Sequence, residues 1–441
     1  MNWNQLLSSK RFGMETYSGG KHDDRSEFQR DYDRLIFSAP FRRLQNKTQV
    51  FPLPGSVFVH NRLTHSLEVA CVGRSIGNAI VPKLNEKYHN SIQFINDIGA
   101  VTSAACLAHD LGNPPFGHSG EQAIATYFSE GNGNVFNEMM TTEEWADLTH
   151  FEGNANTFRL LTHQFEGRRK GGFALTYSTL AAIVKYPYES QFAEKNKIKF
   201  GFFQSEKESY KRIADDLGIV KDPENSNRYA RHPLVYLVEA ADDICYLVMD
   251  IEDAHKLKII TTEETKEILM QFMTEQKRQH AAKIFANVHD ANEQIGYLRS
   301  VVIGLLVDAC TQTFIENEEN ILNGTFRQSL IKQIDTPLKE AYQKASNLSK
   351  ERIYSASEVL DIELSGYKII TMLMDSLMEA VFHPEKSYSK RLLMRIPSQY
   401  ATKAPTPYGK AQAILDYVSG MTDIYALDLY QKIMGMSLPT L

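Results

Sequence analysis

Apolar residues recur at three- and four-residue spacing along most of this 441-residue chain. The pattern covers residues 26–44, resumes at about residue 64 and is strong over residues 233–255. Such spacing puts the apolar side chains on one face of an α-helix. The β-branched and aromatic residues around Pro-Leu-Pro-Gly at 52–55 predict one short β-hairpin. Because strand signals are otherwise few, we expect an all-α fold class with a single hairpin.

The length allows one large globular unit or two or three ordinary domains. A change in composition near Asn323 separates an expected catalytic core, residues 1–322, from an additional C-terminal helical region, residues 323–441. No flexible linker marks this boundary. We therefore expect the C-terminal helices to pack on the core.

The charge of the chain limits its partners. A net charge of −6 and a pI of about 6.1 give no overall positive field to attract nucleic acid or an anionic membrane, so a polyanionic substrate needs a local cluster of Lys and Arg. The four cysteines form no CxxC pair and lie in apolar segments, which predicts buried thiols in a reducing compartment. The sequence shows neither a signal peptide nor the roughly 18 uninterrupted apolar residues of a membrane span. We expect a cytoplasmic protein.

A histidine and an aspartate stand together where an apolar helix is expected to end. The apolar residues 104–108 precede His109 and Asp110, and Gly112 comes shortly before two prolines. We expect Gly112 to end the helix in the left-handed C-cap conformation, because the prolines prevent its continuation. A carboxylate buried there is costly unless it is paired or bound to a metal. An isolated His-Asp pair is more often a structural cap or ion pair than a metal site.

Other residues strengthen the metal hypothesis. His65 lies at the start of the preceding predicted helix, and Asp242 and Asp243 lie between apolar residues of a later one. Asp242 is the better candidate, because only it places Tyr246 and Asp250 at the +4 and +8 positions of one helical face. Two imidazoles and two carboxylates favour a six-coordinate divalent ion over a closed zinc site. Mg²⁺ and Mn²⁺ are the expected ions, and another divalent ion stays open because such ligands do not select sharply.

His118 and Glu121 are three residues apart just beyond the His-Asp doublet. On a helix they share a face, and a carboxylate that orients a histidine and raises its basicity is a common acid–base arrangement. A solvated His-Glu pair at the start of a helix is the alternative.

These residues resemble a known family. His65, the His109-Asp110 doublet and Asp242 look like the four ligands of the HD-domain metal-dependent phosphohydrolases. Within that superfamily, ordered segments along nearly the whole chain resemble the deoxyguanosine triphosphate triphosphohydrolase (dGTPase) family: FRRLQNKTQVF, HNRLTHSLEVA, LAHDLGNPPFGHSGE, HFEGNANTFRLL, RHPLVYLVEAADDICY and DYVSGMTDIYALDLY. The HD doublet alone is a weak signal, whereas the ordered set is specific.

The resemblance implies hydrolysis of a deoxynucleoside triphosphate (dNTP) at the α-phosphorus, which gives the deoxynucleoside and inorganic triphosphate and lowers or balances dNTP pools. It also implies a homo-oligomer, a tetramer or a hexamer, with contacts through the C-terminal helices. An allosteric dNTP or single-stranded DNA is a further ligand that the family suggests. The base preference, dGTP alone or all dNTPs, stays open.

The same resemblance assigns roles to individual residues. It implies that His118 and Glu121 form the catalytic pair and that His150 lies beside the phosphates, although a histidine at a helix terminus is also common for structural reasons. The implied substrate contacts are the 3′-hydroxyl acceptors Gln49 and Asp250, the sugar-packing Tyr246 and the phosphate-binding Arg62, Lys185 and Lys199, with Arg231 as a further candidate. Tyr246 taken alone is equally typical of a core tyrosine.

Two other functions stay open. Other HD phosphohydrolases, such as a 5′-nucleotidase or a cyclic-nucleotide phosphodiesterase, share the four ligands but need neither the His118-Glu121 pair nor the Tyr246-Asp250 spacing. A non-catalytic nucleotide sensor or single-strand-binding module on the same scaffold is the second alternative. The complete set of ligand types and the acidic net charge both argue against it.

Overall fold

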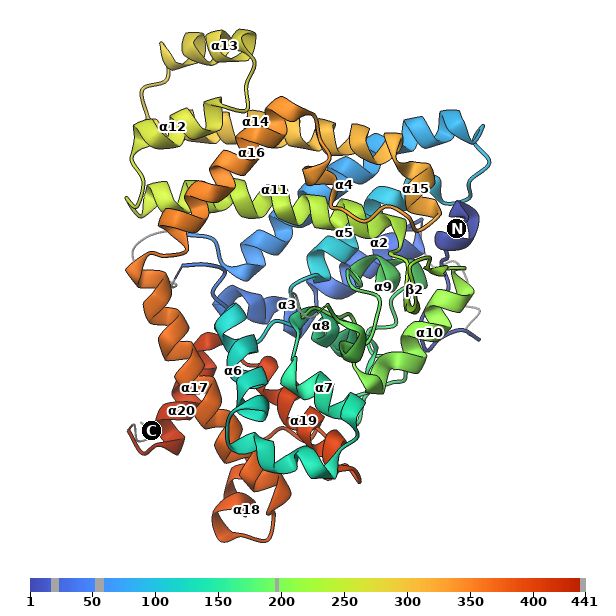
Figure 1. The fold of residues 1–441 in the computed structure, drawn as a ribbon, viewed down its shortest axis with the longest axis vertical. Coiled ribbons are helices and arrows are strands. Elements are labelled where there is room, and N and C mark those ends of the chain that lie inside the picture. Colours follow the sequence, from blue (N-terminus) through green and yellow to red (C-terminus); the bar gives the residue numbers. More distant parts are fainter. Residues whose placement is uncertain (17–23, 52–58, 195–197, 437–441) are drawn as a thin grey trace.

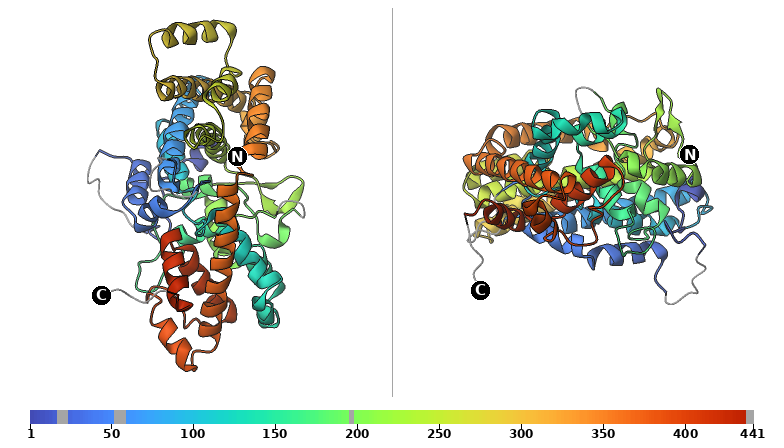
Figure 2. Two further views of the ribbon diagram at one scale, coloured as in Figure 1. Left: turned by 90° about the vertical axis from the view of Figure 1, so that its left-hand side faces the viewer. Right: turned by 90° about the horizontal axis from the view of Figure 1, so that it is seen from below.

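The computed structural model describes residues 1–16, 24–51, 59–194 and 198–436. Helices dominate this part of the chain, and its only sheet has two antiparallel strands. The molecule is elongated, with α11, α14 and α16 toward one end and α17 to α20 toward the other (Figure 1). The left view of Figure 2 shows the same long axis from the side, and the right view looks along it. The all-α fold class is confirmed.

The first half of the chain forms mainly helices. Their bounds are α1 (Trp3–Leu6), α2 (Glu27–Ile36), α3 (Ala39–Arg43), α4 (Arg62–Lys87), α5 (Ile98–Ala108), α6 (Gly117–Ser129), α7 (Thr142–Thr149), α8 (Gly153–Thr162), α9 (Tyr177–Ile183) and α10 (Lys207–Asp216). Short 3₁₀ helices cover Leu44–Asn46, Ile95–Asp97, Asn132–Met139, Ser190–Phe192 and Gln204–Glu206.

The second half begins with the sheet and continues with longer helices. The bounds are β1 (Lys221–Asp222), β2 (Asn225–Tyr229), α11 (Pro233–Lys256), α12 (Thr262–Met270), α13 (Glu275–Phe285), α14 (Ala291–Glu316), α15 (Glu318–Leu322), α16 (Thr336–Leu348), α17 (Ser357–Phe382), α18 (Ser387–Leu393), α19 (Pro407–Ser419) and α20 (Asp423–Ile433). A 3₁₀ turn covers Leu330–Lys332 and a π-helical turn covers Ser349–Ile353. The strand pair aligns Lys221 with Tyr229 and Asp222 with Asn225.

The site-bearing helices α4, α5 and α11 form the centre of the larger apolar cluster. Every residue of α5 except Ala100 is buried, which explains the apolar run before His109. The helix α4 begins at a capping box in which Asn61 and Thr64 satisfy each other's backbone amides, and α11 begins with Pro233 in its first turn. These start signals place His65 in the first turn of α4 and Asp242 in the middle of α11.

A second apolar cluster joins α6 and α7 to the C-terminal helices α17, α19 and α20. A buried ion pair reinforces this contact, since Arg159 of α8 donates from Nε and Nη2 to the two carboxylate oxygens of Asp416 in α19, both at 2.8 Å. Arg159 also donates from Nη1 to Glu206 at 2.7 Å. The C-terminal helices thus pack on the rest of the chain, while the domain boundary at residue 322 stays a prediction.

Several local expectations differ from the structure. The predicted helix over 26–44 is divided into α2 and α3, because Ser38 caps α3 and Pro40 occupies its first turn. Cys71 is exposed, whereas the other three cysteines are buried as expected. The hairpin expected around 52–55 lies outside the described residues, although Thr48 and Asn61 on either side form an isolated antiparallel bridge. The sheet at residues 221–229 had no counterpart among the predicted elements.

Among the described residues, α14 alone is long and apolar enough to cross a membrane, and a third of its apolar window (33%) is buried. Core helices of soluble proteins pass the same test, and α14 packs against α4, α11 and α12. It is therefore weak evidence for a membrane span.

Candidate active site

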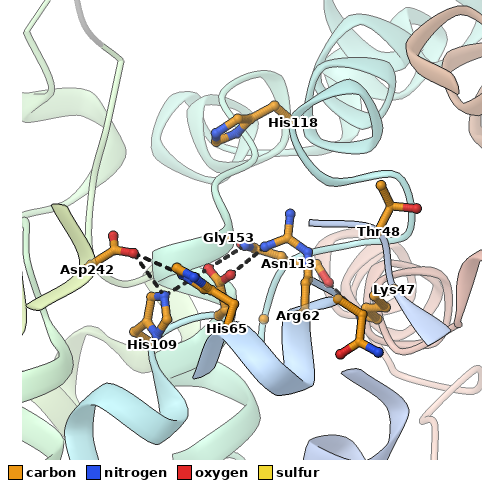
Figure 3. Close-up of polar contacts among 12 residues, drawn as sticks. Lys47, Thr48, Arg62, His65, His109, Asn113, His118, Gly153 and Asp242 are labelled. Atoms are coloured by element: carbon orange, nitrogen blue, oxygen red, sulfur yellow. Dashed lines mark hydrogen bonds and ion pairs between the residues drawn. The ribbon is translucent and has the colours of Figure 1, made fainter. Parts of the chain in front are cut away.

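Three of the four expected metal ligands converge on one point. The imidazole Nε2 atoms of His65 and His109 lie 3.1 and 3.5 Å from the same oxygen, Oδ1 of Asp242. The donor atoms of these residues all lie within 4.8 Å of one another. Figure 3 shows the cluster, with α4, the end of α5 and α11 each supplying one side chain. His65 and His109 are 44 positions apart in the sequence, and His109 and Asp242 are 133 apart, so the packing of the helices brings them together.

Asp110, the fourth expected ligand, lies beside His109. Its Oδ1 lies 3.5 Å from His109 Nε2, and the guanidinium of Arg62 donates to its Oδ2. Asn113 also donates to Asp110, at 2.7 Å. Burial alone would raise the pKa of Asp110, but Arg62 and His109 lower it to about 2. The carboxylate is therefore charged at every physiological pH.

The ring of His109 is oriented for metal binding. Its Nδ1 donates to the backbone carbonyl of Cys106 at 2.7 Å, which leaves Nε2 facing Asp242 and Asp110. A hydrogen bond of this kind fixes the tautomer of a metal-binding histidine. Burial opposes the charge of this imidazole, yet the two carboxylates raise the pKa of His109 to about 9. The pocket thus attracts a cation where the nitrogen and oxygen donors meet.

The residues fit a divalent metal ion. Two imidazole nitrogens and an oxygen of Asp242 lie within reach of one ion, and Asp110 Oδ1 lies 3.5 Å from one of these nitrogens. Such a mixed nitrogen and oxygen set suits a divalent ion, and the two carboxylates supply two negative charges. His65, His109, Asp110 and Asp242 would hold the ion. The donor set does not select between Mg²⁺ and Mn²⁺.

Gly112 has a different role from the one expected. The helix α5 ends at Ala108, and Gly112 is not among the residues with positive φ. Instead, a Cβ atom at Gly112 would lie 2.1 Å from the backbone nitrogen of Thr157 in α8. Its backbone amide donates to Thr157 Oγ1 at 2.9 Å, and its carbonyl accepts from Asn156 at 2.6 Å. Glycine is therefore required by the close approach of α8, which holds the His-Asp turn in place.

The expected acid–base pair forms at the start of α6. His118 Nδ1 and Glu121 Oε2 lie 2.8 Å apart, and Glu121 Oε1 accepts from the backbone amide of Gly153 at 2.8 Å. The hydrogen bond and charge of Glu121 raise the pKa of His118. Burial acts to raise the pKa of Glu121, but His118 and Lys199 lower it overall. Since the side chain of His118 is 80% exposed, its ring is free to meet a ligand.

One cavity of about 480 Å³ brings most of the expected site residues together. Its lining includes the metal-site residues His109, Asp110 and Asp242, the pair His118 and Glu121, and the expected substrate contacts Gln49, Arg62, Lys185, Lys199 and Tyr246. His65 lies beneath this lining, buried against Asp242. The sequence motifs therefore meet at one place.

The two expected phosphate-binding lysines enter this cavity with acidic partners. Lys185 Nζ lies 3.2 Å from Glu239, and Lys199 Nζ donates to Glu152 at 2.6 Å and lies 3.9 Å from Glu121. Arg231 shares Glu239 with Lys185 but does not line the cavity. A phosphate bound here would compete with these carboxylates for the two ammonium groups.

The residues expected at the sugar form one aromatic corner. Tyr246 lies edge-on to His65, with ring centroids 6.4 Å apart, and beside Tyr354 at 5.7 Å. Tyr354 donates its hydroxyl to Asp250 Oδ2 at 2.7 Å, and Asp250 is buried and does not line the cavity. Gln49 lines the cavity, and its Oε1 is buried without a hydrogen bond among the described residues. Gln49 is therefore the better placed of the two predicted 3′-hydroxyl acceptors.

His150 is set apart from the other expected catalytic residues. It caps the C-terminus of α7 and does not line the cavity. Its Nδ1 is buried without a hydrogen bond among the described residues, and burial lowers its pKa. His150 is thus absent from the cavity lining, and its place beside the phosphates stays a prediction.

The sequence reasoning did not select two buried polar residues, Lys47 and Asp423, that hold the backbone beside the cavity. Lys47 is buried and donates to the backbone carbonyls of Asn113 and Ser419, the latter at 2.8 Å. Asp423, at the start of α20, accepts from the backbone amides of Thr48 at 2.7 Å and of Phe116 at 3.0 Å. Figure 3 places Lys47 and Thr48 on the side of Asn113 away from Asp242. Both residues lie in segments that carried the family resemblance, which was the available signal.

Comparisons with known proteins agree with this geometry. Residues 62–191 match the HD domain family, and residues 333–432 match the family described as phosphohydrolase-associated domain. The chain is 36% identical to the deoxyguanosinetriphosphate triphosphohydrolase-like protein of Synechocystis sp., with 99% of this chain and all of the relative covered. It is 36% identical to a protein of the same description from Pseudomonas aeruginosa, with both chains fully covered. It is also 29% identical to the deoxyguanosinetriphosphate triphosphohydrolase of Yersinia enterocolitica, with 99% of each covered.

Proposed function

Since the chain belongs to the deoxyguanosinetriphosphate triphosphohydrolase-like family of HD-domain phosphohydrolases, we propose that it hydrolyses a deoxynucleoside triphosphate at the α-phosphorus. The products are the deoxynucleoside and inorganic triphosphate. One observation carries the proposal: a single cavity holds metal-ligand residues, a His-Glu pair, two lysines and a sugar-sized aromatic corner. The consequence for the cell would be a lowered or rebalanced dNTP pool.

The chemistry requires charge neutralisation at phosphorus and a proton for the leaving oxygen. A divalent ion held by His65, His109, Asp110 and Asp242 would supply Lewis-acid stabilisation and an activated water when bound. Arg62 lies against Asp110, where its guanidinium also meets charge that develops on the α-phosphate.

His118 is the proposed proton donor. Water adds to the α-phosphorus, the bond from phosphorus to the 5′-oxygen breaks, and the departing alkoxide takes a proton from the imidazolium of His118. Glu121 keeps that imidazole protonated and oriented, and the backbone amide of Gly153 fixes Glu121 in turn. The exposed ring of His118 reaches into the cavity across from the metal-ligand cluster (Figure 3).

Lys185 and Lys199 are the proposed contacts of the β- and γ-phosphates. Each ammonium is paired with a cavity carboxylate, Glu239 and Glu152 respectively, so both are held charged within the lining. Tyr246 forms a flat wall on which a deoxyribose packs, and the buried Gln49 Oε1 is an acceptor for its 3′-hydroxyl. A ribose 2′-hydroxyl would lie against the aromatic ring without a partner, which favours deoxyribonucleotides.

Product analysis tests the proposal. Each dNTP, alone and in pairs, is incubated with the protein with and without Mn²⁺ in water enriched in oxygen-18, and the products are separated by anion exchange. We expect equal amounts of deoxynucleoside and inorganic triphosphate, with the heavy oxygen in the triphosphate because attack occurs at phosphorus. Stepwise release of orthophosphate, the pattern of another HD phosphohydrolase, would contradict it, as would the label in the deoxynucleoside. The ratio of the hydrolysis rates of dGTP and GTP measures the discrimination against ribonucleotides.

The remaining predictions about assembly rest on the family resemblance. They are a cytoplasmic homo-oligomer, a tetramer or hexamer with the C-terminal helices at its contacts, and a response to an allosteric dNTP or to single-stranded DNA. Light scattering with each ligand and activity measured with pairs of dNTPs test them together.

A further inference from the structure

A single carboxylate of the C-terminal helix α20 joins two parts of the substrate-cavity wall. Asp423 accepts from the backbone amide of Thr48 through Oδ2 at 2.7 Å and from that of Phe116 through Oδ1 at 3.0 Å. Thr48 and Phe116 both line the cavity, although they are 68 positions apart in the sequence. Thr48 directly precedes Gln49, and Phe116 stands two residues before His118. Each hydrogen bond therefore ends beside a residue that the proposed reaction uses.

The place of Asp423 in the fold suits this contact. The residue is buried in the first turn of α20, where the partial positive charge of a helix N-terminus favours a carboxylate. Thr422, the preceding residue, caps the helix by accepting from the backbone amide of Tyr425 at 3.1 Å. Asp423 thus does not cap its own helix. Its two oxygens satisfy amides of the cavity wall, where a buried amide without an acceptor is costly.

Phe116 lies at a point of the backbone that needs support. Phe116 and Gly117 both have the left-handed conformation, with φ of 62° and 58°. For a bulky residue such as phenylalanine this conformation is strained and persists only where the surroundings hold it. No side chain caps α6, which begins at Gly117, and a Cβ atom on Gly366 of α17 would lie 2.5 Å from Phe116 Cβ. Asp423 and α17 thus hold the turn that leads into His118.

We infer that Asp423 is a positioning residue of the active site, which sets His118 and Gln49 relative to one another. The inference rests on the proposed function, because Asp423 acts through the proton donor His118 and the 3′-hydroxyl acceptor Gln49. A misplacement of about 1 Å costs up to about 100-fold in rate. Loss of the carboxylate therefore impairs proton transfer through Phe116 and the sugar contact through Thr48, and it leaves the metal-ligand residues in place.

Kinetics of Asp423→Ala test the catalytic half of the inference. The control is Asp428→Ala, which removes an exposed acid of the same helix that pairs with Lys432. We expect kcat for dGTP to fall about 10- to 100-fold in Asp423→Ala with its metal content unchanged, and to stay the same in Asp428→Ala. In a His118→Ala background Asp423→Ala should have little further effect, because the proton donor is already absent. A general loss of stability would lower the activity in both backgrounds.

The sugar half is tested with 2′,3′-dideoxy-GTP, which lacks the 3′-hydroxyl. The ratio of kcat/KM for dGTP to that for the dideoxy substrate should fall about two- to tenfold in Asp423→Ala, as for the loss of one hydrogen bond. The ratio should not change in Asp428→Ala. In a Gln49→Ala background Asp423→Ala should leave the ratio unchanged, because the acceptor is already missing.

Hydrogen exchange measured by mass spectrometry tests the contacts without any substrate. Peptides that cover residues 44–50 and 112–118 should exchange faster in Asp423→Ala than in the wild type and the Asp428→Ala control. Asp423→Asn keeps the size of the side chain and one acceptor oxygen, so it should loosen at least one of the two segments even if the alanine variant folds poorly.

Unchanged exchange of both segments in Asp423→Ala and Asp423→Asn would overturn the inference. An equal loss of kcat from Asp423→Ala in the wild-type and His118→Ala backgrounds would also overturn it. A wild-type protein that releases no inorganic triphosphate from any dNTP would contradict the proposed function instead, and exchange would still decide whether Asp423 holds the two segments.

Discussion

Replacement of Asp242 by asparagine should remove the metal and the activity together. The two imidazole Nε2 atoms lie 3.1 and 3.5 Å from the same Asp242 oxygen, so this substitution removes the one anion between them. Loss of an outer hydrogen-bond partner of a metal ligand typically costs about 10- to 100-fold in metal affinity. Loss of a direct carboxylate ligand should exceed that, which sets a lower bound of about 100-fold, or about 2.7 kcal/mol.

Asp243→Asn is the matched control. Its carboxylate does not line the substrate cavity, and burial raises the pKa of Asp243 to about 7 despite the charge of Lys185. The assay is metal content by mass spectrometry after gel filtration in limiting Mn²⁺, followed by calorimetric titration and turnover of dGTP. Asp243→Asn should bind the metal like the wild type. Stoichiometric, tightly bound metal in Asp242→Asn, or its loss only in Asp243→Asn, would refute the assignment of Asp242.

Three further predictions concern the acid–base pair and the buried ion pairs. His118→Ala should lower kcat by about 10²- to 10⁴-fold with its metal content intact, because only the proton donor is lost, and metal analysis beside steady-state kinetics checks this. In the wild type the rate should fall as pH rises through the raised pKa of His118, and Glu121→Gln should shift this fall to lower pH, which a pH–kcat profile measures. An unshifted profile would argue against the pairing. Arg159→Met should lower the free energy of unfolding by about 3–5 kcal/mol, because it leaves the carboxylates of Asp416 and Glu206 buried without their cation. Urea unfolding measures this loss, and the exposed control Arg168→Met should unfold like the wild type.

Local sequence was enough to predict many of the helices, because the signals that start and stop a helix act over a few residues. The capping residues before α4, the proline at the start of α11 and the buried run of α5 each depend on neighbours a few positions away. The turn after α5 was harder to predict. Both left-handed conformation and close packing require glycine, and only the structure shows that Gly112 is there because α8 approaches it.

The residues of the candidate site also differ in how far local sequence could predict them. Helical register favoured Asp242 over Asp243 as the predicted ligand and predicted the contact between His118 and Glu121, because residues three or four apart on a helix are neighbours. His150 lies close in sequence to the cavity residue Glu152 but does not line the cavity, so its role beside the phosphates stays a prediction.

The sequence by itself determined the helical class and predicted the ligand types and the acid–base pair, since these follow from composition and from spacings of a few residues. Only the tertiary structure decided that one oxygen of Asp242 faces both imidazoles and that Asp423 accepts from the backbone amides of Thr48 and Phe116. Such contacts join residues up to hundreds of positions apart. Their geometry is set by how helices pack, which no local pattern of residues encodes.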